Sequence, residues 1–152
     1  MPPDHPMRPF VQVACICQAP LQETNGLFSV IRIMDRLPLQ GLTEEMQPQP
    51  LNMLSIVVIL KSGEMSGKYM LRVIPQTPSG KSLPPMQTPA LFERDERGVI
   101  LSVPLGLVAT EEGLYWFDVM IEQEVLTRIP LRVMYQKIQP IPGIPLQPPP
   151  GD

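Results

Sequence analysis

The run Gly80-Lys81-Ser82 is the first feature that could carry chemistry, because it matches the end of a phosphate-binding loop. The complete motif needs a glycine five residues before Gly80, and Pro75 occupies that position. The motif must also open a helix, whereas Leu83-Pro84-Pro85 follows and prevents one. We therefore predict that this run binds no nucleotide.

Cys15 and Cys17 have a spacing that occurs in both disulfides and metal sites. In a strand, such residues lie on one face about 6.6 Å apart with parallel Cα–Cβ bonds, which is the outer limit for a disulfide. A metal ion would need further ligands, and the only histidine, His5, lies in a proline-rich lead. We predict two reduced, buried thiols and no metal site.

The sequence shows no pattern of nucleophile and base, and paired carboxylates are the catalytic arrangement that it leaves open. With His5 as the sole imidazole, a serine or cysteine nucleophile has no base within reach. The acidic residues fall at expected strand ends or in loops, and the aspartates do not cluster as in calcium-binding sandwich domains. These acidic residues are Asp35, Glu44, Glu45, Asp95, Glu96, Glu111 and Glu112. We predict that the protein is not an enzyme and needs no cofactor.

Charge and hydropathy narrow the list of partners. A net charge of −3 and a pI near 5.2 argue against nucleic-acid binding, and no basic run would hold an anionic membrane. The longest apolar run, Ile56–Leu60 with its neighbours, is far shorter than the roughly 20 residues that cross a bilayer. The first residues lack the apolar core of a signal peptide. We therefore expect a cytoplasmic protein.

Prolines make up 21 of the 152 residues, and a proline inside a helix costs about 3 kcal/mol. Between the prolines and glycines the sequence alternates in hydrophobicity or is apolar throughout, as strands do. Strands are predicted over residues 10–18, 27–35, 51–60, 67–75, 98–108, 113–122 and 125–135. Residues 36–50 and 76–91 are expected to be loops, with short strands at most near 37–39 and 90–92.

The fold class that follows is all-β, an antiparallel two-sheet β-sandwich of about seven to nine strands. Residues 10–137 form the sandwich, and residues 1–9 form a flexible N-terminal lead. Residues 138–152 form a Pro-rich C-terminal tail that is extended and polyproline-like.

The last two strands can be paired in register. A three-residue loop over 122–124 sets Phe117 opposite Ile129 and keeps the apolar residues of both strands on one face. The same register sets Ile121 opposite Val125, Tyr115 opposite Leu131, and Asp118 opposite Arg128. Pro130 indicates that its strand is an edge or is bulged there.

Two features could serve as a partner surface. Trp116 falls on the outer face in this register, where it either marks a ligand or partner surface or is covered by a loop or second sheet. In the tail, Pro142, Pro145 and Pro148 have the spacing of polyproline ligands that dock on aromatic grooves. The alternative is that the tail only solubilises the domain or links it to something else.

Two stretches resemble a family of short bacterial proteins classed only as a domain of unknown function. The residues that carry the resemblance are Cys17-x5-Glu23-x-Asn25-Gly26-x2-Ser29-x-Ile31-x-Ile33-x-Asp35 and Gly113-x-Tyr115-x-Phe117-x-Val119. The likeness spans most of residues 10–135 and implies a bacterial, cytoplasmic β-domain. It brings no catalytic residues with it.

The function that we predict is a non-enzymatic protein-binding or assembly module, with self-association as one form of it. Such a protein acts through its surface, its sheet edges or its tail. The alternative is a small-ligand or carbohydrate-binding β-sandwich with its site near Trp116 and Tyr115, and an enzyme ranks third. A well-formed pocket would favour the alternative, and an apolar sheet face would favour assembly.

Overall fold

The computed structural model describes residues 8–139 and 142–143, which form nine strands and no helix. The strands are β1 (Phe10–Gln22), β2 (Phe28–Ile33), β3 (Arg36–Gly41), β4 (Gln49–Pro50), β5 (Ser55–Gln76), β6 (Met86–Pro104), β7 (Val108–Ala109), β8 (Gly113–Ile121) and β9 (Glu124–Lys137). The all-β prediction is therefore confirmed. Residues 1–7 of the predicted lead, and residues 140–141 and 144–152 of the predicted tail, lie outside the described residues.

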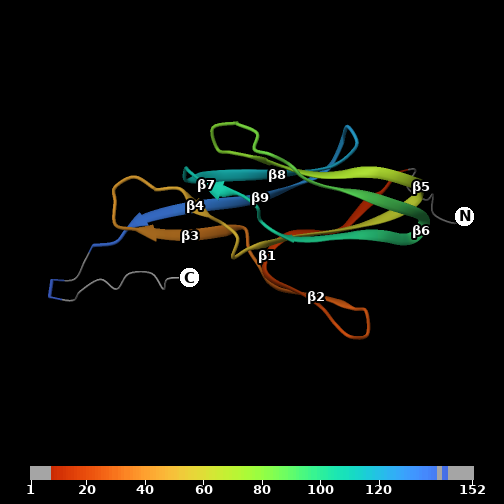
Figure 1. Ribbon diagram of the computed structural model, residues 1–152, viewed down its shortest axis with the longest axis horizontal. Coiled ribbons are helices and arrows are strands. Elements are labelled where there is room, and N and C mark those ends of the chain that lie inside the picture. The colour runs from red at the N-terminus through yellow and green to blue at the C-terminus, as the bar shows by residue number, and fades with distance from the viewer. Residues whose placement is uncertain (1–7, 140–141, 144–152) are drawn as a thin grey trace, which may run out of the picture.

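The strands form two packed layers because β5 and β6 are long enough to belong to both. The part of β5 over 55–61 pairs with β1 and with the end of β6, whereas the part over 67–76 pairs with the start of β6 and with β8. The first sheet thus has the order β2-β1-β5-β6, and the second has the order β6-β5-β8-β9-β3. Figure 1 shows β8, β9 and β3 side by side at one end, with the β5–β6 bend at the other.

The bend in β5 lies between two glycines with left-handed backbone, Gly63 (φ 61°) and Gly67 (φ 115°). Register shifts on both sides of Gly63 interrupt the β5–β6 ladder there. The buried hydroxyl of Ser62 donates to the Arg97 carbonyl (2.6 Å) and accepts from the Glu93 amide (3.2 Å), so it satisfies groups that the broken ladder leaves unpaired. This bend merges two predicted strands, 51–60 and 67–75, into one.

One strand pair corrects the prediction of a purely antiparallel sandwich. β3 runs parallel to β9, with Arg36 to Gly41 beside Arg132 to Lys137. The stretch was expected to be mainly loop because residues 36–50 are rich in proline and glutamine. Proline is compatible with this place because β3 is an edge strand, and Leu37 and Leu39 on either side are buried. The sheet is therefore mixed.

The β8–β9 hairpin confirms most of the predicted register and corrects its end. Phe117 lies opposite Ile129, Tyr115 opposite Leu131, and Asp118 opposite Arg128, as predicted. However, Ile121 pairs with Glu124 instead of Val125, so the loop is the two residues Glu122-Gln123, with Glu122 at a φ of 51°. A bulge restores the register further along the strand.

The residue inserted by that bulge is Leu126. Val119 lies opposite Thr127 and Met120 opposite Val125, so Leu126 has no partner on β8. Leu126 packs against the core, and Val125, which was expected to face inward, is 43% exposed. The bulge therefore turns Leu126 toward the core and Val125 toward solvent.

The main hydrophobic core lies between the two sheets. Its fully buried side chains include Ile16, Ile56, Leu60, Leu71, Phe92, Tyr115, Phe117 and Leu131. A second, smaller cluster of Cys15, Cys17 and Val57 lies separately, on the outer face of the first sheet. The pair β4–β7 adds the neighbouring Leu51, Leu105 and Leu107 to one end of the main core.

Candidate functional site

Trp116 is the only tryptophan of the chain, and it lies on the outer face of the second sheet with 39% of its surface exposed. Its neighbours along β8, Tyr115 and Phe117, are fully buried, so the alternation of the strand directs Trp116 away from the core. The register places it between Gln76 of β5 and Pro130 of β9. The predicted outward position of Trp116 is confirmed.

Apolar side chains surround Trp116 on this face. Leu114 precedes it by two residues on β8 and shares its face, and Pro130 lies directly opposite on β9. Ile74, opposite Asp118 on β5, is a diagonal neighbour. All three are half-buried. We call Ile74, Leu114, Trp116 and Pro130 the Trp116 face.

Arginines border the Trp116 face. Arg128 forms an ion pair with Asp118 (Nε–Oδ1 3.1 Å), and Arg36 forms one with Asp35 (3.5 Å). Arg132 lies beside Arg36 in the parallel register of β3 and β9.

On the other side of the face, Arg72 of β5 is opposite Met120 of β8, and its Nε is buried without a hydrogen-bond partner. Four arginines thus share this side of a protein whose net charge is −3.

Of the three predicted tail prolines, the structure describes Pro142 alone. Pro142 is exposed in a turn with Gly143, whose φ of 87° suits a glycine. Pro145 and Pro148 lie outside the described residues. Where the structure describes the chain, Trp116 therefore stands alone among the predicted partner-surface residues.

Tyr115, the other aromatic residue of the predicted ligand site, belongs to the hydrophobic core. It is fully buried, and its hydroxyl donates to the Glu111 carbonyl over 2.7 Å. Burial raises the pKa of the Tyr115 hydroxyl. A ligand on the outer face could therefore contact Trp116 but not Tyr115.

The Gly80-Lys81-Ser82 run lies in a tight turn whose side-chain hydroxyls already have hydrogen-bond partners. The Thr77 amide donates to the Lys81 carbonyl (2.8 Å), and Gly80 adopts a φ of 88°. The Ser79 amide and hydroxyl both donate to the Glu111 carboxylate (3.1 and 2.9 Å). These bonds lower the pKa of the Glu111 carboxyl and bind this turn to the start of β8.

A cavity of about 330 Å³ lies beside the β8–β9 turn. Its apolar wall is formed by Met65, Tyr69, Ile121 and Leu126, and Arg8 and Glu124 form an ion pair (2.9 Å) at its rim. Its volume is at the lower end of the range for small-molecule sites. It is the second candidate site, and sequence reasoning missed it because the bulge at Leu126 helps to form it.

Two further findings concern residues 8–139 and 142–143. No three His, Cys, Asp or Glu side chains within them gather closely enough to hold a metal ion. None of these residues belongs to a helix long and apolar enough to cross a membrane.

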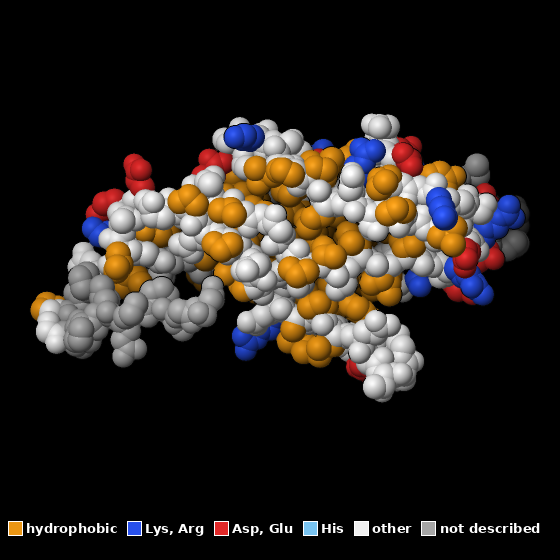
Figure 2. All heavy atoms as spheres, viewed as in Figure 1, with side chains coloured by type: hydrophobic (Ala, Val, Ile, Leu, Met, Phe, Trp, Pro, Cys, Tyr) orange, Lys and Arg blue, Asp and Glu red, His pale blue; other side chains and the backbone are white. Residues whose placement is uncertain are grey.

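Figure 2 shows one face of the molecule, on which hydrophobic side chains spread across the middle and charged side chains gather toward the two ends.

The sequence located Trp116 but not its neighbours, because Ile74 reaches it through a pairing between strands distant along the chain. The sequence did offer one signal for Ile74, which is the alternation of inward and outward side chains along a strand. Arg72 and Ile74 are two residues apart in a predicted strand, so alternation places both on the same face.

No family model and no curated protein matches the chain. Among solved structures, the chain is similar to a crystal structure of an immunoglobulin-like protein from Pseudomonas aeruginosa, with 12% identity and a TM-score of 0.42, over 84% of this chain and 97% of that one. These findings are consistent with a family that has no assigned function. The likeness is too low to transfer a role.

Proposed function

We propose that the protein is a non-enzymatic binding or assembly module that engages another protein through the Trp116 face. The observation that supports this most is an exposed tryptophan at the centre of an apolar sheet face bordered by arginines. Tryptophan and arginine are the residue types most often found at the energetic centre of protein interfaces. An open sheet face also suits a protein surface better than a small molecule, which binds in concave sites.

The charges of this face suggest the chemistry of the partner. Arg36 and Arg128 are paired with Asp35 and Asp118, whereas Arg72 and Arg132 form no ion pair with another described residue. A guanidinium recognises a carboxylate through paired hydrogen bonds. The partner that fits is therefore a protein with an apolar patch and carboxylates at its border, and binding should weaken as salt concentration rises.

The setting that we propose is the bacterial cytoplasm, as the sequence resemblance implies. The buried thiols of Cys15 and Cys17 support a reducing compartment.

Substitution of Trp116 tests the proposal. Trp116→Ala should weaken binding of a partner isolated with the wild-type protein by about 30-fold or more, the effect expected of an interface centre. The matched control is Ile31→Ala, which removes another exposed apolar side chain from the distant β1–β2 hairpin. Because Trp116 is the only tryptophan, its emission should also shift to shorter wavelength as the purified partner is added. Equal affinity of the wild-type protein and Trp116→Ala would contradict the proposal.

The cavity beside the β8–β9 turn supports a second candidate function, which is binding of a small apolar ligand. Five of its lining residues are hydrophobic or aromatic. Apolar ligands of suitable size should raise the melting temperature of the wild-type protein and of Trp116→Ala alike, because a ligand bound only by the folded state stabilises it. Leu126→Trp, which fills the cavity, should abolish the shift. A shift that survives Leu126→Trp would place the ligand elsewhere.

A further inference from the structure

The outer edge of β6 is open along the described chain. β6 pairs with β5 alone, so it is the edge strand of both sheets at once. An edge strand presents a row of unpaired amide and carbonyl groups to any other strand that approaches. Proteins usually protect such edges with prolines, charged residues, bulges or a covering segment.

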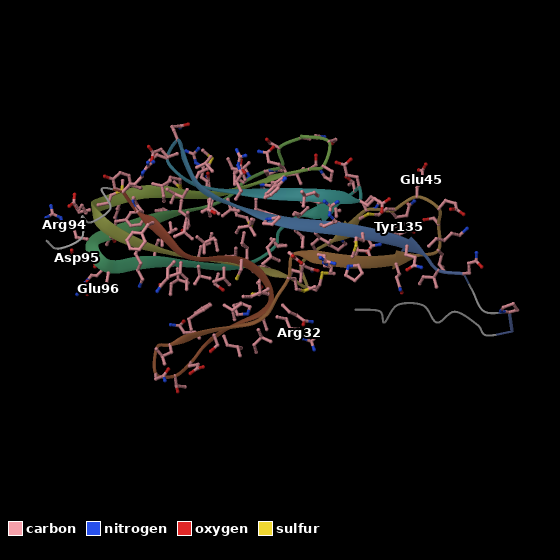
Figure 3. The ribbon with its side chains drawn as sticks, turned by 180° about the vertical axis from the view of Figure 1, so that it is seen from behind. Arg32, Glu45, Arg94, Asp95, Glu96 and Tyr135 are labelled. Carbon is pink, nitrogen blue, oxygen red and sulfur yellow. The ribbon has the colours of Figure 1, made fainter. Side chains whose placement is uncertain are left out.

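Most open edges of this molecule carry that protection. Pro38 interrupts the edge of β3, and Pro89 interrupts the first part of β6. β2 carries the charged Arg32, which has a positive φ of 57°. The charged run from Glu93 to Arg97 protects the bend of β6, and Figure 3 shows Arg94, Asp95 and Glu96 together at the end of the molecule opposite Tyr135.

The stretch of β6 over 98–103 has none of these devices. Its sequence, Gly-Val-Ile-Leu-Ser-Val, contains no proline and no charge, and Ile100 is 54% exposed on its outer side. It pairs in unbroken register with β5, from Gly98 opposite Lys61 to Val103 opposite Ile56. The edge is therefore straight, apolar and uninterrupted, which are the properties that allow a further strand to add.

We infer that this edge pairs with the same edge of a second copy of the chain, antiparallel and about a two-fold axis. With the axis at Ile100, the two Ile100 residues face each other, Gly98 faces Ser102, and Val99 faces Leu101. This register keeps outer residues opposite outer residues, as sheet pairing requires. A two-fold axis also closes the contact, so that the result is a dimer and not a filament.

The charge pattern does not oppose a second copy as the occupant. In this register Arg97 falls opposite Val103 of the partner and Glu96 falls opposite Pro104, so no like charges meet across the axis. The four-stranded first sheets of both copies then join into one continuous sheet. This inference concerns the first sheet and does not depend on the Trp116 face.

The test is the oligomeric state of the full chain, measured by analytical ultracentrifugation over a range of concentrations. The wild-type protein should show a monomer–dimer equilibrium, and Ile100→Lys should raise the dissociation constant at least tenfold by placing two charges at the axis. Leu91→Lys is the matched control, because Leu91 is a 47% exposed residue of the same strand outside the open stretch. It should leave the dimer unchanged.

Other variants separate the possible outcomes. If Ile100→Lys does not fold, as judged by circular dichroism, Ser102→Lys makes the same test at another exposed outer position of the edge. Trp116→Ala should dimerise normally, so failure of the proposed function does not alter the result here. A wild-type protein that stays monomeric at several hundred micromolar would overturn the inference. A dimer that survives both lysine variants, or one that Leu91→Lys disrupts, would also overturn it.

Discussion

Cys15 and Cys17 point away from the main core, on the outer face of the first sheet. Phe28 and Val30 of β2 pack against them, and burial raises the pKa of both thiols. The two cysteines lie where β1 pairs with β5, next to the β1–β2 hairpin that Figure 1 shows projecting from the body. Access to the thiols therefore depends on this hairpin.

Thiol labelling should report how well the hairpin covers the cysteines. Native protein should react slowly and unfolded protein fast, and the native rate should keep rising as the pH passes the ordinary cysteine range near 8.5, because the thiolate is the reactive form. Phe28→Ala should speed native labelling, whereas Ile31→Ala, an exposed position of the same strand, should not. Equal labelling rates for the two variants would show that Phe28 does not control access.

Gly98 is required for a steric reason. Its backbone is extended, but a Cβ atom there would collide with the Leu60 carbonyl on β5. Gly98→Ala should therefore lower the free energy of unfolding by about 1–3 kcal/mol, the usual cost of overpacking, in a chemical denaturation experiment. Gly106→Ala is the control because nothing lies within 4 Å of its added Cβ. The explanation by close approach is wrong if both variants are equally stable.

At the scale of elements, alternation and turn residues predicted most strands. Asn-Gly is a typical turn dipeptide, and Asn25-Gly26 lies in the β1–β2 turn, where Gly26 has a φ of 85°. The bulges could not be predicted, because the sequence of one strand does not show where its partner gains a residue. Regular alternation would place Val11 on the same face as Cys15, but a register shift between Val11 and Val13 turns Val11 toward the core. A bulge is also the reason that Val125 is exposed and Leu126 packs against the core.

The turn around Gly80 allows a test by pH. The folded state lowers the pKa of the Glu111 carboxyl through its bonds to Ser79, so its contribution to stability is present at neutral pH. That contribution should be lost as the pH falls below about 4.3, the ordinary glutamate value, and through the lowered one. The melting temperatures of the wild-type protein and Glu111→Gln should therefore converge as the pH falls.

Ser79→Ala provides the control for this pH effect, since it removes one of the two donors to the carboxylate. In the Ser79→Ala background, the additional substitution Glu111→Gln should change the melting temperature less than it does in the wild-type protein. A change that is independent of pH in both backgrounds would contradict the role given to Glu111.

At the scale of the molecule, the sequence predicted which residues are buried better than which strands meet. Adjacent strands pair through short turns that leave a sequence signal, as β8 and β9 do. The β3–β9 and β5–β8 pairs join distant segments, and nothing in one sequence specifies them. For the same reason the sequence could place Trp116 outward but could not assemble Ile74 and the arginines around it.

The contrast between Phe117 and Trp116 tests this two-layer arrangement. The two residues are adjacent on β8, but Phe117 is fully buried in the core shared by both sheets while Trp116 lies on the outer face. Phe117→Ala should lower the free energy of unfolding by about 3–5 kcal/mol, because it leaves a cavity between the layers. Trp116→Ala should cost much less, since its ring already meets water. Chemical denaturation of both variants measures the difference. Similar losses would mean that the Trp116 face is a covered part of the fold and would remove the basis for a partner surface there.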